Sequence, residues 1–200
     1  AGAGRLSTVR SLVLVRARGA TDISGMQSVE WKAEVRDPSI VRALVRRMGG
    51  VCASVADQSD TYYRVIDGTL LKREVEGEPP EFVHYVRPPG VRPRHARFTL
   101  YSEEQAAERF GVRPLPVWVV VEKRRECWLL DGVRIHLDNV ESLGTFVELE
   151  VLVTPDQRPD AGEEKIARLR ERLGPFVGEP VARGYAELLA LELETDDSAA

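Results

Sequence analysis

The sequence predicts an α+β fold built on one sheet of about eight mostly antiparallel strands, closed into a β-barrel with helices packed outside. From residue 26 onward, strand signals come in pairs separated by turns. Several strands carry charges of both signs on one face and apolar residues on the other. If helices cover the apolar faces, the charged faces look away from them. In a closed sheet those faces line a charged lumen.

The segments between residues 28 and 101 fit this pattern in turn. A helix is predicted over residues 37–50, because Asp37 is a good N-cap, Pro38 suits the first turn and Gly49 suits the end. The pair Asp67-Gly68 predicts a hairpin turn. Strands are predicted over residues 28–35, 59–65, 69–76, 81–87 and 95–101.

The second half of the chain adds the clearest hairpin, which turns at Asp131-Gly132. Strands are predicted over residues 117–130, 132–140 and 145–153, and helices over residues 102–111, 162–174 and 184–194. The apolar helix residues available to cover the sheet are Ile40, Leu44, Val45, Met48, Ile166, Leu169 and Leu173.

The chain is interpreted as a single domain over residues 26–193. Residues 1–25 are rich in Ala, Gly, Ser and Arg and are expected to form a loose N-terminal extension, with Met26 directly before the first strand. Residues 194–200 are expected to be a frayed tail.

Composition excludes several kinds of protein. A net charge of −4, from 28 basic and 32 acidic residues, argues against nucleic-acid binding. No apolar run approaches a membrane span, so no membrane partner is expected. Two cysteines, Cys52 and Cys127, are too few for a disulfide framework, and the three histidines lack metal-ligand spacing. A cytoplasmic location follows as the default.

The charged strand faces form the main candidate site. Its basic members are Lys32, Arg73, Arg87, Lys123, Arg125 and Arg134, and its acidic members are Glu30, Asp138, Glu148 and Glu150. Basic side chains suit phosphate oxygens, whereas clustered carboxylates suit Mg²⁺ or Mn²⁺. Together they indicate a metal-bound polyphosphate, and the bases are then expected to contribute little to folding. The alternative is a solvated sheet face with surface ion pairs.

Four stretches carry a family resemblance: SVEWKAEV, QSDTYYRV, EKRRECWLLDGVRIHLDNVESLGTFVELEV and GYAELL. They resemble the CYTH superfamily, which comprises class IV adenylyl cyclases and thiamine and inorganic triphosphatases. The resemblance covers about residues 27–190. It implies an eight-stranded antiparallel β-barrel tunnel that binds a triphosphate with a divalent metal.

The resemblance also implies roles for individual residues. The family's E-x-E-x-K motif falls on residues 28–32, which gives Glu30 and Lys32 catalytic roles, although Ser28 replaces the first glutamate. Thr69 and Leu71 replace two basic residues of relatives. The implied substrate-binding residues are Arg73, Arg87, Lys123 and Arg125, to which strand alternation adds Arg134. The implied ligands of Mg²⁺ or Mn²⁺ are Glu30, Asp138, Glu148 and Glu150.

The resemblance is strongest to the class IV adenylyl cyclases, which convert ATP to cyclic AMP and pyrophosphate. Two alternatives stay open: an inorganic or thiamine triphosphatase, and a non-catalytic nucleotide or polyphosphate binder whose metal site is degenerate. The partner is therefore a nucleoside triphosphate or another organic or inorganic triphosphate, and a homodimer is left open. Weaker candidates are Tyr62, Tyr85 and Trp128 for base stacking, His136 and Cys127 on the charged face, and Arg94 and Arg97 near the tunnel mouth.

Overall fold

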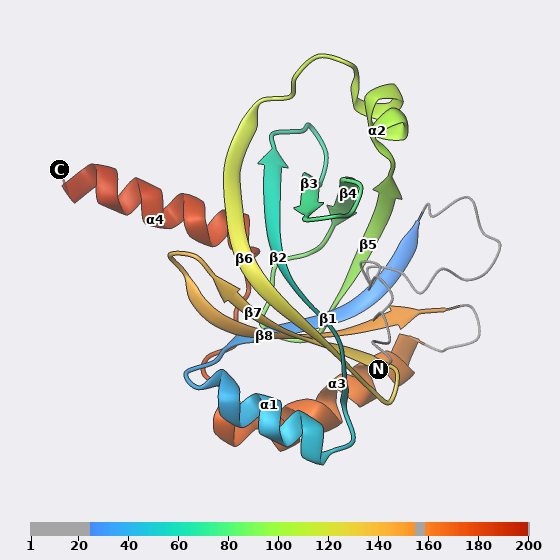
Figure 1. Ribbon diagram of the computed structural model, residues 1–200, viewed down its shortest axis with the longest axis vertical. Helices are drawn as coiled ribbons and strands as arrows, with labels where there is room; N and C mark the ends of the chain where they lie inside the picture. The colour runs from blue at the N-terminus through green and yellow to red at the C-terminus, as the bar shows by residue number, and fades with distance from the viewer. Residues whose placement is uncertain (1–24, 155–158, 200) are drawn as a thin grey trace, which may run out of the picture.

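The computed structural model describes residues 25–154 and 159–199, and its centre is a closed barrel of eight strands (Figure 1). Most of the predicted N-terminal extension and the final residue lie outside the described residues. The strands are β1 (Met26–Glu34), β2 (Val51–Tyr63), β3 (Thr69–Val75), β4 (Glu81–Val86), β5 (Arg94–Tyr101), β6 (Val117–Leu130), β7 (Val133–Val140) and β8 (Gly144–Val153).

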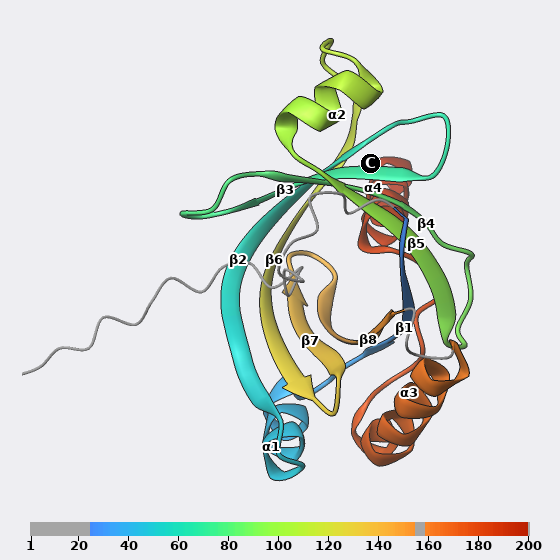
Figure 2. The ribbon, with the colours of Figure 1, turned by 90° about the vertical axis from the view of Figure 1, so that its right-hand side faces the viewer.

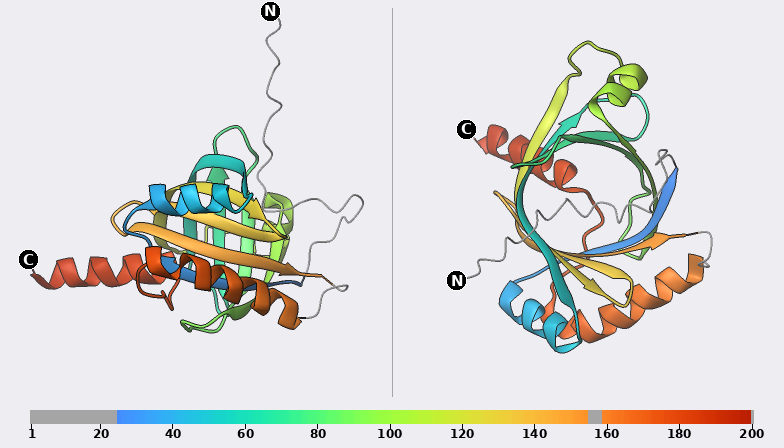
Figure 3. Two further views of the ribbon diagram at one scale, coloured as in Figure 1. Left: turned by 90° about the horizontal axis from the view of Figure 1, so that it is seen from below. Right: turned by 45° about the vertical axis from the view of Figure 1, so that its right-hand side comes forward.

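Around the barrel the strands follow the order β1-β5-β4-β3-β2-β6-β7-β8, and each neighbouring pair is antiparallel. The right-hand view of Figure 3 looks into this ring. The predicted fold class, an antiparallel barrel with helices outside, is therefore confirmed.

Helices surround the barrel without entering the ring of strands. They are α1 (Pro38–Arg47), α2 (Glu103–Phe110), α3 (Pro159–Leu173), a short 3₁₀ turn η1 (Gly174–Phe176) and α4 (Tyr185–Ala199). The Asp37 side chain caps α1 by accepting a hydrogen bond from the Ser39 backbone N–H at 2.9 Å. Helices α1 and α3 lie on one side of the barrel and α2 on the opposite side (Figure 2).

The main hydrophobic core lies outside the barrel wall, between β1, β7 and β8 and the helices α1 and α3. Ile135 and Leu149 from the strands meet Ile166 from α3, and all three are fully buried. On α1 the expected residue Ile40 is 42% exposed, and Val41 packs into the core instead. The other three predicted residues of this helix, Leu44, Val45 and Met48, do pack into or against the core, so the apolar stripe of α1 is centred on Val41 and Val45.

Several element boundaries differ from the prediction, and the start of β2 and the end of α4 differ most. Strand β2 starts at Val51 rather than residue 59, because residues 51–58 pair with the long strand β6 although their own sequence alternates poorly. A register shift between Cys52 and Ser54 interrupts this pairing. Helix α4 continues to Ala199, beyond the predicted end at residue 194. None of the helices within the described residues is long and apolar enough to cross a membrane.

Residues 177–184, here called the strap, connect η1 to α4. They run alongside the end of β1. The backbone N–H of Gly178 donates to Glu34 O at 2.7 Å, and the N–H of Val181 donates to Lys32 O at 2.9 Å. The strap thus brings the first residue of α4, Tyr185, next to the barrel lumen, where it is 4% exposed.

Candidate functional site

The lumen encloses a cavity of about 190 Å³ lined by charged side chains from six of the eight strands. Nine predicted site residues line it: Glu30, Lys32, Arg73, Arg87, Lys123, Arg125, Arg134, Glu148 and Glu150. The tenth, Asp138, is fully buried and is bonded to residues that do line it. Alternation along the strands therefore places the predicted charges inside the barrel, not on a solvated outer face.

Asp60 on β2 is a lumen residue that the sequence analysis missed. It is fully buried, and its two carboxylate oxygens each accept a hydrogen bond at 2.7 Å from the Arg73 guanidinium. Lys123 donates to the same carboxylate. Burial alone would raise the pKa of Asp60, but Arg73 and Lys123 hold the pKa well below its usual value. Strand alternation could have found Asp60, because it lies two residues from Tyr62 and so points to the same face of β2, the face that lines the cavity.

Asp138 on β7 forms a second buried cluster. Its carboxylate accepts hydrogen bonds from Arg125 Nε at 2.7 Å and from the Tyr185 hydroxyl at 2.8 Å. The Tyr185 ring also lies against the Lys32 ammonium, 3.5 Å from Nζ to the ring centroid. Burial, together with the Asp138 charge, raises the pKa of Tyr185 well above its usual value. Tyr185 therefore remains a neutral hydrogen-bond donor.

These pairings change the expected contribution of the bases to folding. Lys123 and Arg125 were expected to contribute little, yet each neutralises a fully buried carboxylate, Asp60 or Asp138. Removing one partner of such a pair leaves an uncompensated buried charge. We therefore expect alanine at either position to lower the free energy of unfolding as well as ligand affinity.

A third cluster brings three carboxylates together from β1 and β8. Glu30 lies beside Glu150 in the strand register and accepts a hydrogen bond from Ser28 Oγ at 2.9 Å. Burial and the nearby negative charge of Glu148 raise the pKa of Glu30, although Arg87 lies 3.0 Å away. A carboxylate with a raised pKa in such surroundings is stabilised by a further cation.

The other two carboxylates of this cluster are held in the charged form by bases. Burial would raise the pKa of Glu148, but Lys32, at 3.7 Å, and Arg125, at 3.1 Å, lower it. Glu150 accepts from Arg134 at 2.6 Å and lies 3.3 Å from His136 Nε2.

The donor chemistry of this third cluster fits a hard divalent cation, which prefers carboxylate oxygens. Burial and the negative charge of Glu148 raise the pKa of Glu30, so a cation bound beside Glu30 would stabilise its ionised form. Within residues 25–154 and 159–199, no three acidic, histidine or cysteine side chains already surround a common point. The pairing explains this, since each carboxylate turns toward a base.

Burial also lowers the pKa of the two lumen lysines. The pKa of Lys32 and that of Lys123 both fall to about 8, because desolvation outweighs the attraction of Glu148 and of Asp60 respectively. Both lysines are mostly protonated at neutral pH and can still bind an anion. Their charge is lost, however, a little above pH 8.

The weaker candidates separate into two groups. Trp128 lies outside the lumen, 5.2 Å from the Arg46 guanidinium of α1, so the stacking role considered for it is wrong. Arg97 is exposed, whereas Arg94 is buried and donates to Gly90 O at 2.8 Å and to Ala182 O of the strap. Neither arginine lines the cavity.

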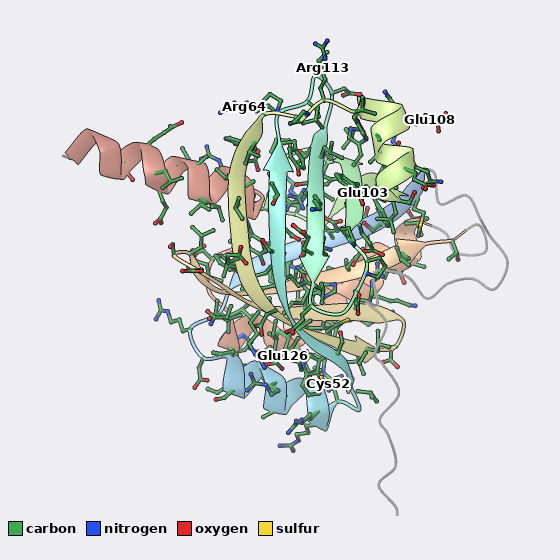
Figure 4. All side chains as sticks on the ribbon, turned by 45° about the horizontal axis from the view of Figure 1, so that its top comes forward. Cys52, Arg64, Glu103, Glu108, Arg113 and Glu126 are labelled. Carbon is green, nitrogen blue, oxygen red and sulfur yellow. The ribbon has the colours of Figure 1, made fainter. Side chains whose placement is uncertain are left out.

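Tyr62, Tyr85, His136 and Cys127 do line the cavity. Burial raises the pKa of the Cys127 thiol, which disfavours a thiolate nucleophile. The other cysteine, Cys52, is exposed on the α1 side of the barrel, near Glu126 (Figure 4).

A model of the CYTH domain matches residues 26–185. The chain belongs to the CYTH domain family. No curated protein sequence matches it. The resemblance read from the strand motifs is thereby confirmed.

Several solved structures share this CYTH fold. A conserved hypothetical protein from Pyrococcus furiosus has a TM-score of 0.62 at 23% identity, covering 80% of this chain and 99% of that one. A candidate adenylate cyclase from Vibrio parahaemolyticus has a TM-score of 0.59 at 22% identity, covering 84% and 99%. A candidate adenylyl cyclase from Hippeastrum, described with a dominant triphosphatase activity, has a TM-score of 0.53 at 11% identity, covering 84% and 96%. At these identities the likeness concerns the fold.

Proposed function

We propose that the lumen binds a triphosphate together with Mg²⁺ or Mn²⁺, and that the protein is a class IV adenylyl cyclase-like enzyme. The single observation that carries the proposal is a solvent-connected cavity lined by six bases, which come from β1, β3, β6 and β7 and from the residue after β4. The bases are Lys32, Arg73, Arg87, Lys123, Arg125 and Arg134. Arginine and lysine directed from several sides at one space are suited to the oxygens of a phosphate chain.

Binding requires an exchange of partners, because Glu30 pairs with Arg87, Glu148 with Lys32 and Glu150 with Arg134. These three carboxylates, with Asp138 beside them, would hold the divalent cation, which would supply charge neutralisation at the reacting phosphorus. The released bases Arg87, Lys32 and Arg134 then turn to phosphate oxygens. Metal and triphosphate are thus expected to bind cooperatively.

In the cyclase reaction the ribose 3′-oxygen forms a bond to the α-phosphorus, and the bond from that phosphorus to the bridging oxygen breaks. The 3′-hydroxyl gives its proton to solvent water, and pyrophosphate leaves. Arg73, Arg125 and Lys123 are assigned to the β- and γ-phosphates, whose negative charge rises as pyrophosphate departs. Glu30 and Lys32 are assigned to the reacting centre, where they orient the cation and neutralise charge.

Hydrolysis of a triphosphate is the second candidate, because the same lumen bases could hold the phosphate chain so that water attacks the terminal phosphorus. The Hippeastrum protein, which has the same fold and is described with a dominant triphosphatase activity, supports this second candidate. A non-catalytic binder is the third, since Ser28 occupies the position of the family's first glutamate and supplies no carboxylate.

Product analysis separates the three. Purified protein is incubated with ATP, inorganic triphosphate or thiamine triphosphate, each with Mg²⁺ and with Mn²⁺. We expect cyclic AMP and pyrophosphate in equal amounts from ATP. Orthophosphate without cyclic nucleotide would instead establish the triphosphatase. Binding without any product would establish the non-catalytic binder, and absence of binding would refute the proposal.

A further inference from the structure

Arg94, the first residue of β5, is a buried cation with one unpaired edge. It is 5% exposed, and its Nη1 donates to Gly90 O at 2.8 Å and to Ala182 O of the strap. Within residues 25–154 and 159–199, its Nε and Nη2 are buried and have no hydrogen-bond partner. Buried donors without an acceptor cost free energy, so these two atoms are expected to gain an acceptor in another state of the protein.

The unpaired edge of Arg94 is the edge that two other arginines of the barrel use to bind carboxylates. Arg73 binds Asp60 through Nε and Nη2. Arg125 binds Asp138 through the same two atoms. Two parallel hydrogen bonds of this kind are among the strongest that an arginine makes. The acceptor that suits Nε and Nη2 of Arg94 is therefore a carboxylate.

Three carboxylates act on the charge of Arg94. Burial and the neighbouring Arg87 lower the pKa of Arg94, and the carboxylates that oppose this shift are Glu148, Glu30 and Glu187. Glu148 already lies near two other bases, at 3.7 and 3.1 Å. Glu187 is exposed and accepts a hydrogen bond from the backbone just before α4. Glu30 is thus the buried carboxylate that is best placed to pair with Arg94.

Strand register also places Glu30 directly beside Arg94. Strands β1 and β5 lie side by side (Figure 2), and Glu30 of β1 is the register partner of Arg94. Opposite residues of an antiparallel pair point to the same face, with their Cβ atoms about 5 Å apart. In this structure Glu30 pairs instead with Arg87, at 3.0 Å. A change of side-chain rotamer can turn the Glu30 carboxylate from one arginine to the other.

From this geometry we propose that Arg94 is a positioning residue, the second partner that Glu30 takes when Arg87 turns to a phosphate. The inference rests on the proposed triphosphate-binding function, in which Arg87 is one of the released bases. Without a second partner, Glu30 would be a buried and uncompensated anion close to the phosphate chain. Arg94 supplies the compensating charge, so the lumen can bind a triphosphate before a divalent cation arrives. A cation bound beside Glu30 takes over this role.

The test compares triphosphate affinity with and without metal. Calorimetry measures the dissociation constant of a triphosphate analogue whose two bridging oxygens are CH₂ groups, so that no turnover consumes it. One series contains a chelator and the other contains saturating Mn²⁺. The natural protein should bind in both. Arg94→Met should weaken binding in the chelator by about tenfold or more, and binding with Mn²⁺ by less than about twofold. A merely structural role would weaken both alike.

Arg97→Met is the matched control, because Arg97 is an exposed arginine of the same strand. It should change neither dissociation constant. Should Arg94→Met fail to fold, Arg94→Lys is the second variant. A lysine ammonium can still donate to Gly90 O and Ala182 O, but it lacks the two-atom edge that binds a carboxylate. This variant should weaken binding in the chelator by at least about threefold and leave binding with Mn²⁺ unchanged.

A double-mutant cycle tests whether Glu30 is the partner. The glutamine of Glu30→Gln carries no charge, so it needs no second arginine when Arg87 turns to the ligand. Adding Arg94→Met to Glu30→Gln should therefore change the affinity in the chelator by less than about twofold.

Equal weakening with and without Mn²⁺, no weakening, or weakening that persists in the Glu30→Gln background would each overturn the inference. A natural protein that binds the analogue only with Mn²⁺ would also overturn it, while leaving the proposed function intact. If the natural protein binds the analogue under neither condition, the proposed function fails together with this inference.

Discussion

The two faces of strand β7 differ in what they bury: one buries apolar side chains and the other buries charged ones. Its outward residues Ile135 and Leu137 are buried under α1 and α3, in the apolar core. Its inward residues Arg134, His136 and Asp138 are also buried but lie among other charges. Burying apolar surface stabilises a fold by about 25 cal/mol per Å², whereas burying charges costs free energy that ion pairs only partly offset. The outer face therefore stabilises the barrel, and the inner face is held ready for a ligand.

The largest expected effect is on the inner face. The double variant Glu148→Gln/Glu150→Gln removes two of the three carboxylates of the third cluster and should lower metal-dependent turnover by at least about a hundredfold. Triphosphate binding without metal should persist or tighten, because the two carboxylates no longer compete with the phosphate oxygens for Lys32 and Arg134. Turnover assays and calorimetry measure the two effects.

The control for this variant is Glu104→Gln/Glu108→Gln on α2, where both residues are exposed. It removes the same charge from the outer surface and should leave turnover unchanged. Unaltered Mg²⁺ dependence in the lumen variant would move the metal site away from β8.

On the outer face, Ile135→Ala should lower the free energy of unfolding by about 2–5 kcal/mol, because a fully buried side chain is truncated against α1 and α3. Chemical denaturation measures this loss. The affinity of the folded protein for triphosphate should stay the same. A matching loss of affinity would mean that the two faces are not independent.

Asp60→Asn tests whether the buried carboxylate competes with the ligand for Arg73 and Lys123. Asparagine keeps the shape but removes the charge, so triphosphate should bind about tenfold more tightly, roughly 1.4 kcal/mol. The free energy of unfolding should fall by about 1–3 kcal/mol, since two buried cations lose their counter-charge. Weaker triphosphate binding would show instead that Asp60 serves to position the bases.

The smallest expected effect is a pH dependence with opposite signs for binding and stability. Burial lowers the pKa of Lys123 to about 8, below its value in the unfolded chain. Triphosphate binding should therefore weaken as pH rises through about 8, by at most about tenfold per pH unit for each of the two lysines Lys32 and Lys123. Between pH 8 and the unfolded-state pKa, the unfolded chain binds more protons, so stability should rise. Calorimetry and denaturation from pH 7 to 9.5 check both trends, and a flat binding curve would exclude a role for protonated lysine.

Sequence alone predicted much of the fold because β7 and β8 alternate strictly, and a strict period of two assigns each side chain to a face. The same rule gives Trp128 the opposite phase to Cys127, and so the outer face where it lies, although the sequence analysis names Trp128 as a candidate for base stacking. Asp60 lies inside the predicted strand 59–65 and has the same parity as Tyr62, so alternation assigned it to a face but did not show that it is buried between two bases. Its partners Arg73 and Lys123 depend on pairing with two other strands, which no local pattern records.

Tyr185 could not be predicted for a similar reason. The motif around it reads as the start of an amphipathic helix, and only the path of the strap along β1 brings its ring to Lys32 and its hydroxyl to Asp138. Its place is therefore a property of tertiary structure, which sequence periodicity does not encode.

The adjacent residues Lys123 and Arg124 of β6 allow the central claim to be tested directly. Lys123 is buried in the lumen, and Arg124 points outward, where it pairs with the exposed Asp57. Thermal unfolding is measured for the natural protein, Lys123→Gln and Arg124→Gln, each with and without millimolar triphosphate and Mg²⁺. A ligand at a hundred times its dissociation constant stabilises a fold by about 2.7 kcal/mol. We predict a clear rise in melting temperature for the natural protein and Arg124→Gln, and a much smaller rise for Lys123→Gln. Equal rises for all three, or none, would contradict the assignment of the lumen as the triphosphate site.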